Sequence, residues 1–233
     1  RRAPLGDARG VFALGTLLGL GIFLPGFLQR VPVNTVVVGK WPAGPHRHTT
    51  PSPSRGEAVS RPPMYQRATV TRVIKETADA RTFVLTPEDG PIDYRAGQYC
   101  TFRVDVDGET LHRSYSMSSS PDTDDELRTT IKRVPGGKVS NWLLDNIADG
   151  DTVDMTRAFG TFCLREGHRP VIGYSGGSGI TPILSLAKSA LATTDRDVYL
   201  LCADRDADAA IFTAAIDDLV ARYPERLTVQ RSF

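Results

Sequence analysis

The chain has 233 residues, of which 40% are apolar and 24% are charged, and its formal net charge is +1. These values are typical of a globular protein. A net charge so close to zero argues against nucleic acid as a partner. The three cysteines, Cys100, Cys163 and Cys202, lie too far apart in sequence for a zinc site, a disulfide framework or an iron–sulfur cluster. We therefore expect no metal site, and a reducing, cytoplasmic compartment fits best.

An uncharged run from Val11 to Leu28 dominates residues 1–40. Its 18 residues are barely enough to cross a bilayer, and its glycines weaken any helix that lacks neighbours. Two interpretations stay open: a membrane anchor or insertion signal, which would make the protein membrane-associated, and an atypical leader without a catalytic role. Residues 41–64 are rich in proline and serine and predict an extended linker.

Short apolar and β-branched runs separated by turn residues fill residues 65–167. Six or seven short strands over this length indicate an antiparallel β-barrel, closed or nearly closed. One helix is expected near residues 140–147, with Ser140 as its N-cap. The expected strands cover residues 68–74, 82–85, 99–104, 111–116, 127–134, 152–155 and 161–164.

From residue 168 onward, apolar strands alternate with helices, which is the pattern of a parallel α/β sheet. The chain opens on Arg1 rather than methionine and closes just after a third apolar strand. We therefore expect a fragment or processed form whose second domain, residues 168–233, is incomplete. The expected strands cover residues 171–174, 198–202 and 227–229, and the expected helices cover residues 183–191 and 209–223, the second with Asp208 as N-cap.

The stretch Arg113, Ser114, Tyr115 and Ser116 ends one of the expected strands. Because side chains alternate along a strand, Arg113 and Tyr115 share one face while Ser114 and Ser116 share the other. A flavin requires an aromatic ring against its isoalloxazine or ribityl edge, a hydroxyl near its N5 atom and a cation for its diphosphate. These residue types supply all three. The alternative for so short a match is an ordinary solvated strand face.

A glycine pair, Gly136 and Gly137, precedes the helix expected near residue 140. Without a Cβ these residues allow a phosphate to approach closely, and the N–H groups of residues 138–141 open a helix whose N-terminus attracts anions. Lys132 and Lys138 can add positive charge. The alternative is a glycine turn followed by a helix cap.

A second glycine-rich turn, Gly177, Ser178 and Gly179, lies between a buried strand and a helix. This is the carboxyl end of a parallel strand, where nucleotides bind in such sheets. The turn lacks both the three fixed glycines of the dinucleotide fingerprint and a P-loop lysine. Thr181 is placed to face a flavin, and the alternative is a purely structural strand–helix turn.

In this order and spacing the three segments resemble the ferredoxin–NADP reductase superfamily, over roughly residues 65–229. The motifs are Arg-x-Tyr-Ser at residues 113–116, the glycine turn at residues 137–141 and Gly-x-Gly-Ile-Thr-Pro at residues 177–182. The runs ETADA, TIKRVPGGKVSNWL and GSGITPILSLAKSAL are similar to reductase components of bacterial oxygenases, especially the 3-ketosteroid 9α-hydroxylase and phenylacetyl-CoA epoxidase reductases.

The resemblance implies a role for each segment. Tyr115 and Ser116 would pack on FAD, and Thr181 would lie between flavin and nicotinamide, so Ser116 and Thr181 are the expected catalytic residues. Arg113 and the glycine turn would hold the diphosphate, and Arg205 would meet the adenosine ribose unless it is an ordinary surface charge. The expected cofactor-binding residues are Arg113, Ser114, Tyr115, Ser116, Ile131, Lys132, Arg133, Gly137, Lys138, Val139, Ser140, Gly177, Ser178, Gly179, Thr181 and Arg205.

The implied function is a flavin-dependent oxidoreductase that passes electrons from NAD(P)H through FAD to an iron–sulfur centre of an oxygenase system. The expected partners are a ferredoxin domain or protein and an oxygenase, with the [2Fe–2S] cluster in a domain downstream of Phe233. Two alternatives stay open: an FAD-binding module without NAD(P)H turnover, and a membrane-anchored reductase that uses the run from Val11 to Leu28. The choice between NADH and NADPH is also open, since Asp206 disfavours a 2′-phosphate and Arg205 favours one.

Overall fold

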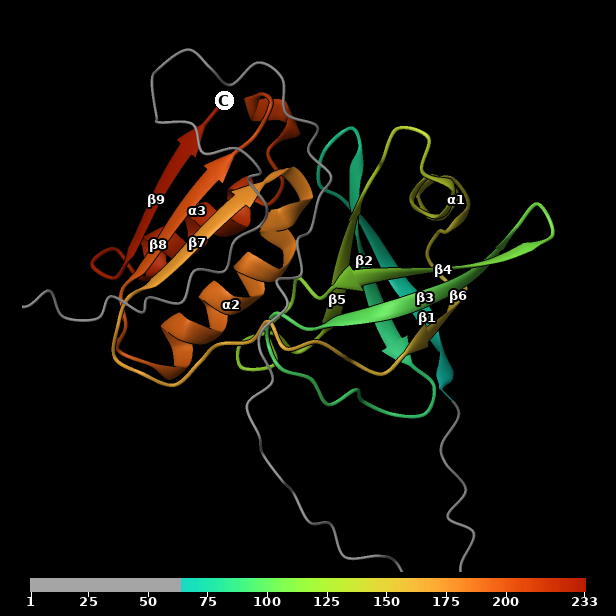
Figure 1. The fold of residues 1–233 in the computed structure, drawn as a ribbon, viewed down its shortest axis with the longest axis horizontal. Helices are drawn as coiled ribbons and strands as arrows, with labels where there is room; N and C mark the ends of the chain where they lie inside the picture. The colour runs from blue at the N-terminus through green and yellow to red at the C-terminus, as the bar shows by residue number, and fades with distance from the viewer. Residues whose placement is uncertain (1–63) are drawn as a thin grey trace, which may run out of the picture.

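The computed structural model describes residues 64–233, so the predictions for the apolar run and for nearly all of the linker lie outside the described residues. The described part contains a six-stranded antiparallel sheet and a three-stranded parallel sheet (Figure 1). In chain order the elements are β1 (Tyr65–Lys75), β2 (Ala80–Pro87), β3 (Tyr99–Val106), β4 (Glu109–Ser116), β5 (Leu127–Lys132), α1 (Lys138–Asn146), β6 (Thr152–Thr156), β7 (Val171–Gly176), α2 (Ile180–Thr193), β8 (Val198–Ala203), α3 (Thr213–Arg222) and β9 (Leu227–Ser232).

The larger sheet has the strand order β4-β3-β6-β1-β2-β5, and every pair in it is antiparallel. It curls until its two edge strands meet, where Met117, just past β4, forms a bridge with Thr129 of β5. The Thr129 hydroxyl also donates a hydrogen bond to the Ser116 carbonyl oxygen at 2.9 Å. Inward-facing side chains of the strands and of α1 fill one apolar core, in which Phe102, Leu143 and Met155 are fully buried. The predicted antiparallel barrel is confirmed.

Residues 161–164, predicted as a seventh strand, join neither sheet. Phe159 still pairs with Tyr99 in an isolated bridge, but Gly160 follows with φ +113°, which turns the chain out of the sheet. The chain then crosses Gly97, where a Cβ would come within 2.0 Å of the Phe162 carbonyl oxygen. The strand prediction was therefore wrong, because the alternation of apolar residues carries no information about this turn.

The smaller sheet has the order β7-β8-β9 with both pairs parallel, as predicted. Both α2 and α3 cover the same face, since the buried side chains of β8, Val198, Leu200 and Cys202, share one core with the buried side chains of both helices. On the opposite face Ile172, Tyr174 and Tyr199 are exposed. Figure 1 shows α2 lying along β7, between the parallel sheet and the barrel.

Both predicted N-caps were wrong. Ser140 occupies the third position of α1, which follows Gly137 and has no side-chain cap. Asp208 lies in a short 3₁₀ turn, Ala207–Ala209, whose cap is Asp206, with its carboxylate accepting from the Ala209 N–H at 2.8 Å. Helix α3 starts only at Thr213, because Phe212 adopts a left-handed backbone with φ +64° and reverses the chain first.

Candidate functional site

The carboxyl end of β4 presents the predicted flavin-binding residues on an edge strand of the barrel. Tyr115 is half-buried against Phe102, with the ring centroids 5.6 Å apart, and burial raises the pKa of its phenol to about 12. The phenol therefore stays protonated at physiological pH and can act as a hydrogen-bond donor. Ser114 is exposed beside it and shares a 2.9 Å hydrogen bond with the Thr101 hydroxyl.

Arg113 is the cation of this strand that stays available for a ligand. Its one side-chain hydrogen bond is a long contact of 3.4 Å to the neighbouring His112 carbonyl oxygen, and it forms no ion pair within residues 64–233. The other basic residues predicted to bind the cofactor are paired with carboxylates. Those pairs are Lys132 with Asp79 at 3.9 Å, Arg133 with Asp145, Lys138 with Glu109 at 2.8 Å, and Arg205 with Asp206 at 3.0 Å. Arg113 therefore has the guanidinium that remains free to bind a diphosphate.

The glycine turn before α1 leaves the start of that helix open. Gly137 caps α1 without a side-chain hydrogen bond, and a Cβ on it would lie 2.7 Å from the Ser140 hydroxyl and 2.9 Å from Val134 Cβ. The Ser140 hydroxyl faces back to the turn and accepts from the Val134 N–H at 3.3 Å. Within the described residues no side chain accepts a hydrogen bond from the first N–H groups of the helix, starting at Lys138 and Val139, so these groups suit an anion.

Two buried polar atoms beside the turn between β7 and α2 have no hydrogen-bond partner within the described residues. Thr181 is buried, and its hydroxyl makes no hydrogen bond within the described residues. The same holds for the Oδ1 atom of Asp204, which follows β8. Burial raises the pKa of the Asp204 carboxyl, while Lys132 and the nearby N–H of Gly177 act in the opposite direction. Since buried polar groups are normally paired, the Thr181 hydroxyl has the character of a ligand-binding atom.

These contacts bring the predicted segments together. Strand β5, which ends with Ile131 and Lys132 and is followed by Arg133, is in contact with the turn formed by Gly177, Ser178 and Gly179. The end of β4 is joined to α2 through the loop that follows it, where Ser185 donates to the Ser119 carbonyl oxygen at 2.6 Å.

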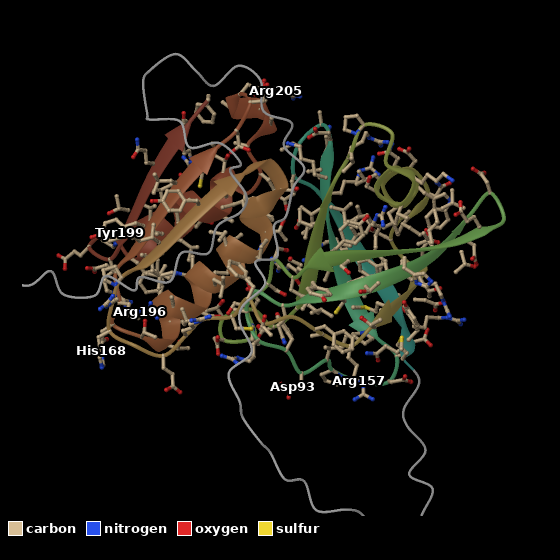
Figure 2. The ribbon with its side chains drawn as sticks, in the orientation of Figure 1. Asp93, Arg157, His168, Arg196, Tyr199 and Arg205 are labelled. Carbon is tan, nitrogen blue, oxygen red and sulfur yellow. The ribbon has the colours of Figure 1, made fainter. Side chains whose placement is uncertain are left out.

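Arg205 lies at the edge of the parallel sheet where its strands end, opposite His168 and Arg196 (Figure 2). Its guanidinium is exposed and pairs with Asp206 at 3.0 Å. The geometry suits a residue that meets the outer end of a nucleotide, but the structure does not bring it to the flavin strand.

Sequence reasoning placed Asp204 with Arg205 and Asp206 after the second parallel strand but gave it no role of its own, and it missed the hydroxyl contacts between α2 and the barrel. The spacing of Thr181, Ser185 and Ser189, three hydroxyl residues at intervals of four in a helix, is the signal that could have found those contacts.

No helix in the described part of the chain has the length and apolar character that a bilayer crossing requires.

Comparison with known proteins agrees with this geometry. Residues 67–163 match the oxidoreductase FAD-binding domain, and residues 174–232 match the oxidoreductase NAD-binding domain. The ferredoxin reductase component of the 3-ketosteroid-9-alpha-monooxygenase from Mycolicibacterium smegmatis is 41% identical over 167 residues, which are 69% of this chain and 47% of the relative. A flavohemoprotein from a Burkholderia species is 37% identical over 158 residues, 67% of this chain and 40% of the relative. The chain thus spans about half the length of the curated relatives it matches, or less.

Solved structures show the same fold. The FAD/NAD-binding domain of nitric oxide dioxygenase from Vibrio cholerae superposes with a TM-score of 0.66 at 29% identity, covering 71% of this chain and 73% of that one. Phthalate dioxygenase reductase, described as a modular structure for electron transfer from pyridine nucleotides to [2Fe–2S], superposes with a TM-score of 0.62 at 24% identity, covering 72% of this chain and 52% of that one.

Proposed function

Because this chain belongs to the oxidoreductases that join an FAD-binding domain to an NAD-binding domain in the ferredoxin–NADP reductase fold, we propose that it oxidises NAD(P)H with FAD and delivers the electrons to an iron–sulfur centre of an oxygenase system. The cluster would lie outside this chain, on a ferredoxin domain or protein; phthalate dioxygenase reductase, whose fold this chain shares, is described as transferring electrons from pyridine nucleotides to [2Fe–2S]. We assign residues 65–167 to the flavin-binding domain and residues 168–233 to the nucleotide-binding domain, a division supported by two apolar cores that share no buried residue, although Ala80 of β2 and Leu164 pack into the second core.

The residues present fit FAD in three ways. Arg113 offers an unpaired guanidinium, the open start of α1 offers N–H groups to a diphosphate, and Tyr115 offers an aromatic surface at the end of β4. When bound, FAD supplies an acceptor that takes two electrons together and releases them one at a time. The protein's part is to bind and orient both cofactors.

The observation that carries the proposal is the unpartnered Thr181 hydroxyl at the start of α2. It lies on the helix that follows the nucleotide turn, and that helix is joined to the loop after the flavin strand. In our assignment Thr181 and the Gly177–Gly179 turn orient the nicotinamide, while Ser116 donates or accepts a hydrogen bond at flavin N5. The outer end of the nucleotide extends toward Arg205.

Free, buried Cys100 and Cys202 support a reducing compartment, and we place the protein in the cytoplasm.

The test begins with the full chain folded in the presence of FAD. We expect a yellow protein whose flavin absorbance bleaches within seconds of adding NADH or NADPH under anaerobic conditions. Protein that stays colourless would refute the flavin site. A yellow protein that neither nucleotide bleaches would favour the binding module without turnover.

A double variant locates the site on β4. Tyr115→Ala with Ser116→Ala should lose most of its FAD and most of its flavin reduction rate. Thr110→Ala, at the other end of the same strand, removes a hydroxyl that, among the described residues, bonds only Asp105, at 2.6 Å, and this variant should match the unmodified protein. Normal FAD content and reduction in the double variant would show that this strand does not hold the flavin.

A further inference from the structure

Helix α2 carries three buried hydroxyl residues at intervals of four. Thr181, Ser185 and Ser189 are 3%, 0% and 3% exposed, so all three lie on one face of the helix and are covered. Most other buried positions of α2 are apolar and belong to the core that it shares with the parallel sheet. The helix therefore has an apolar face toward the sheet and a hydroxyl face toward another partner.

That partner is the loop that continues the flavin strand. Ser185 donates to the Ser119 carbonyl oxygen at 2.6 Å, and the hydroxyls of Ser189 and Ser120 share a hydrogen bond of 2.7 Å. Ser119 and Ser120 are fully buried. Beside them Lys188 of α2 pairs with Asp124 of the same loop at 3.0 Å, with 13% and 15% of the two side chains exposed. We call these three contacts, Ser185–Ser119, Ser189–Ser120 and Lys188–Asp124, the α2 seam.

The α2 seam lies close in sequence to both halves of the proposed site. Ser119 follows Ser116 by three residues, and Ser185 follows Thr181 by one helical turn, about 6 Å along the helix axis. A shift at the seam is therefore transmitted over short distances to the flavin strand on one side and to the nicotinamide turn on the other. Thr181, the third member of the hydroxyl face, has no partner in the barrel and stays free for a ligand.

We infer that Ser185 and Ser189 are positioning residues that set the separation and orientation of the nicotinamide relative to the flavin. This inference rests on the proposed function. Apolar contact is not directional, whereas a hydrogen bond holds donor and acceptor within a few tenths of an ångström and within a narrow angle. Hydroxyls at this boundary therefore fix the position of α2 along the loop. An apolar boundary of equal area would allow α2 to slide.

The test compares Ser185→Ala and Ser189→Ala with Thr193→Ala, using the full chain loaded with FAD. Thr193 is the matched control, since it is on the same helix and exposed, and its hydroxyl bonds only the Ser189 carbonyl oxygen. In anaerobic stopped-flow measurements we expect the limiting rate of flavin reduction to fall about ten- to a hundredfold in the two seam variants, because misplacement by about 1 Å costs that much. The nucleotide concentration for half the limiting rate should change less than about twofold.

A conservative replacement separates positioning from general damage. Ser189→Thr keeps the hydroxyl and should retain most of the limiting rate, whereas Ser189→Ala should not. An unchanged limiting rate in both alanine variants would overturn the inference. So would an equal loss in the Thr193 control, because the effect would then not depend on the seam.

Hydrogen exchange separates failure of this inference from failure of the proposed function. If neither nucleotide reduces the flavin of the unmodified protein, the proposed function fails, and the positioning role fails with it. The seam contacts themselves are still tested by exchange of the amides at residues 117–120 and at the start of α2. These should exchange faster in both alanine variants and at the normal rate in Thr193→Ala. Unchanged exchange would show that the seam does not hold α2 in place.

Discussion

Replacing Gly173 by alanine is a direct test of how closely α2 lies against its sheet. Gly173 is in β7 on the face that α2 covers, and a Cβ there would lie 2.7 Å from Ile183 Cγ2 and 3.0 Å from Leu200 Cδ2. The Leu200 methyl ends a flexible side chain and can rotate away. Ile183 Cγ2 cannot rotate away, because it is bonded to the Cβ atom of a helical isoleucine, whose χ1 has essentially one allowed rotamer. The substitution must therefore push α2 away from β7.

The expected cost follows from this contact. Forcing a methyl group into a packed core costs about 1 to 3 kcal/mol, and the lower entropy of the unfolded alanine chain returns up to about 1 kcal/mol. These two figures allow a net loss of about 0 to 3 kcal/mol, and because Ile183 cannot move aside we expect the free energy of unfolding to fall by about 1 to 2 kcal/mol. Ile183→Ala alone should cost about 2 to 5 kcal/mol through the cavity it leaves. In the double variant the new methyl occupies part of that cavity, so the combined loss should be smaller than the sum by at least about 1 kcal/mol.

Urea denaturation followed by helical circular dichroism measures these losses, because α2 and α3, the two longest helices among residues 64–233, both belong to this half. Gly179→Ala is the matched control, since a Cβ there meets nothing within 4 Å and its φ of −61° suits any residue. It should lose no stability. A Gly173→Ala variant as stable as the unmodified protein, or strict additivity with Ile183→Ala, would refute the close packing described here.

Three further predictions concern the site. Thr181→Val removes a buried unpaired hydroxyl, so it should leave the free energy of unfolding unchanged or raise it. The same variant should slow flavin reduction about tenfold in stopped-flow measurements. An unchanged rate would show that Thr181 is not part of the nicotinamide site. Arg113→Gln should raise the FAD dissociation constant, measured by fluorescence titration, about ten- to a hundredfold, because it removes one charge-assisted hydrogen bond of about 1.5 to 3 kcal/mol. The melting temperature of the flavin-free protein should stay unchanged. Asp204→Asn should raise the free energy of unfolding at pH 7: burial raises the pKa of this carboxyl, so its charged form destabilises the fold above that pKa, and the penalty disappears as the pH falls below the ordinary value of 3.8. Melting curves of the two proteins against pH should therefore converge in acid, and curves that run parallel would contradict this sign.

The order of strands and helices could be predicted because the information is local. Alternating side chains between residues 65 and 156 indicated all six barrel strands, and the change of pattern after residue 168 indicated the parallel sheet. The errors arose where a backbone turn decides the outcome. The positive φ angles of Gly160 and Phe212 turned the chain out of the barrel in one case and delayed α3 in the other, and neither leaves a periodic trace in the sequence.

The candidate site could be predicted only as residue types in order. The motifs around Arg113, Gly137 and Gly177 named the segments, and their roles toward a flavin and a nicotinamide stay predictions. Which cations are already paired could not be read from sequence, because Lys138 meets Glu109 from 29 positions away. The Ser185 contact with Ser119 joins residues 66 positions apart, so its importance emerges only when both are seen in place.

The barrel is complete within one continuous stretch of chain. Each pairing of the larger sheet joins strands between Tyr65 and Thr156, and the most distant of them brings β1 to β6. During synthesis this half can therefore close before β7 has left the ribosome, with the joining of its first and last strands as the slow event. A flavin could then be captured by the nascent chain before the part that presents its reductant has been made.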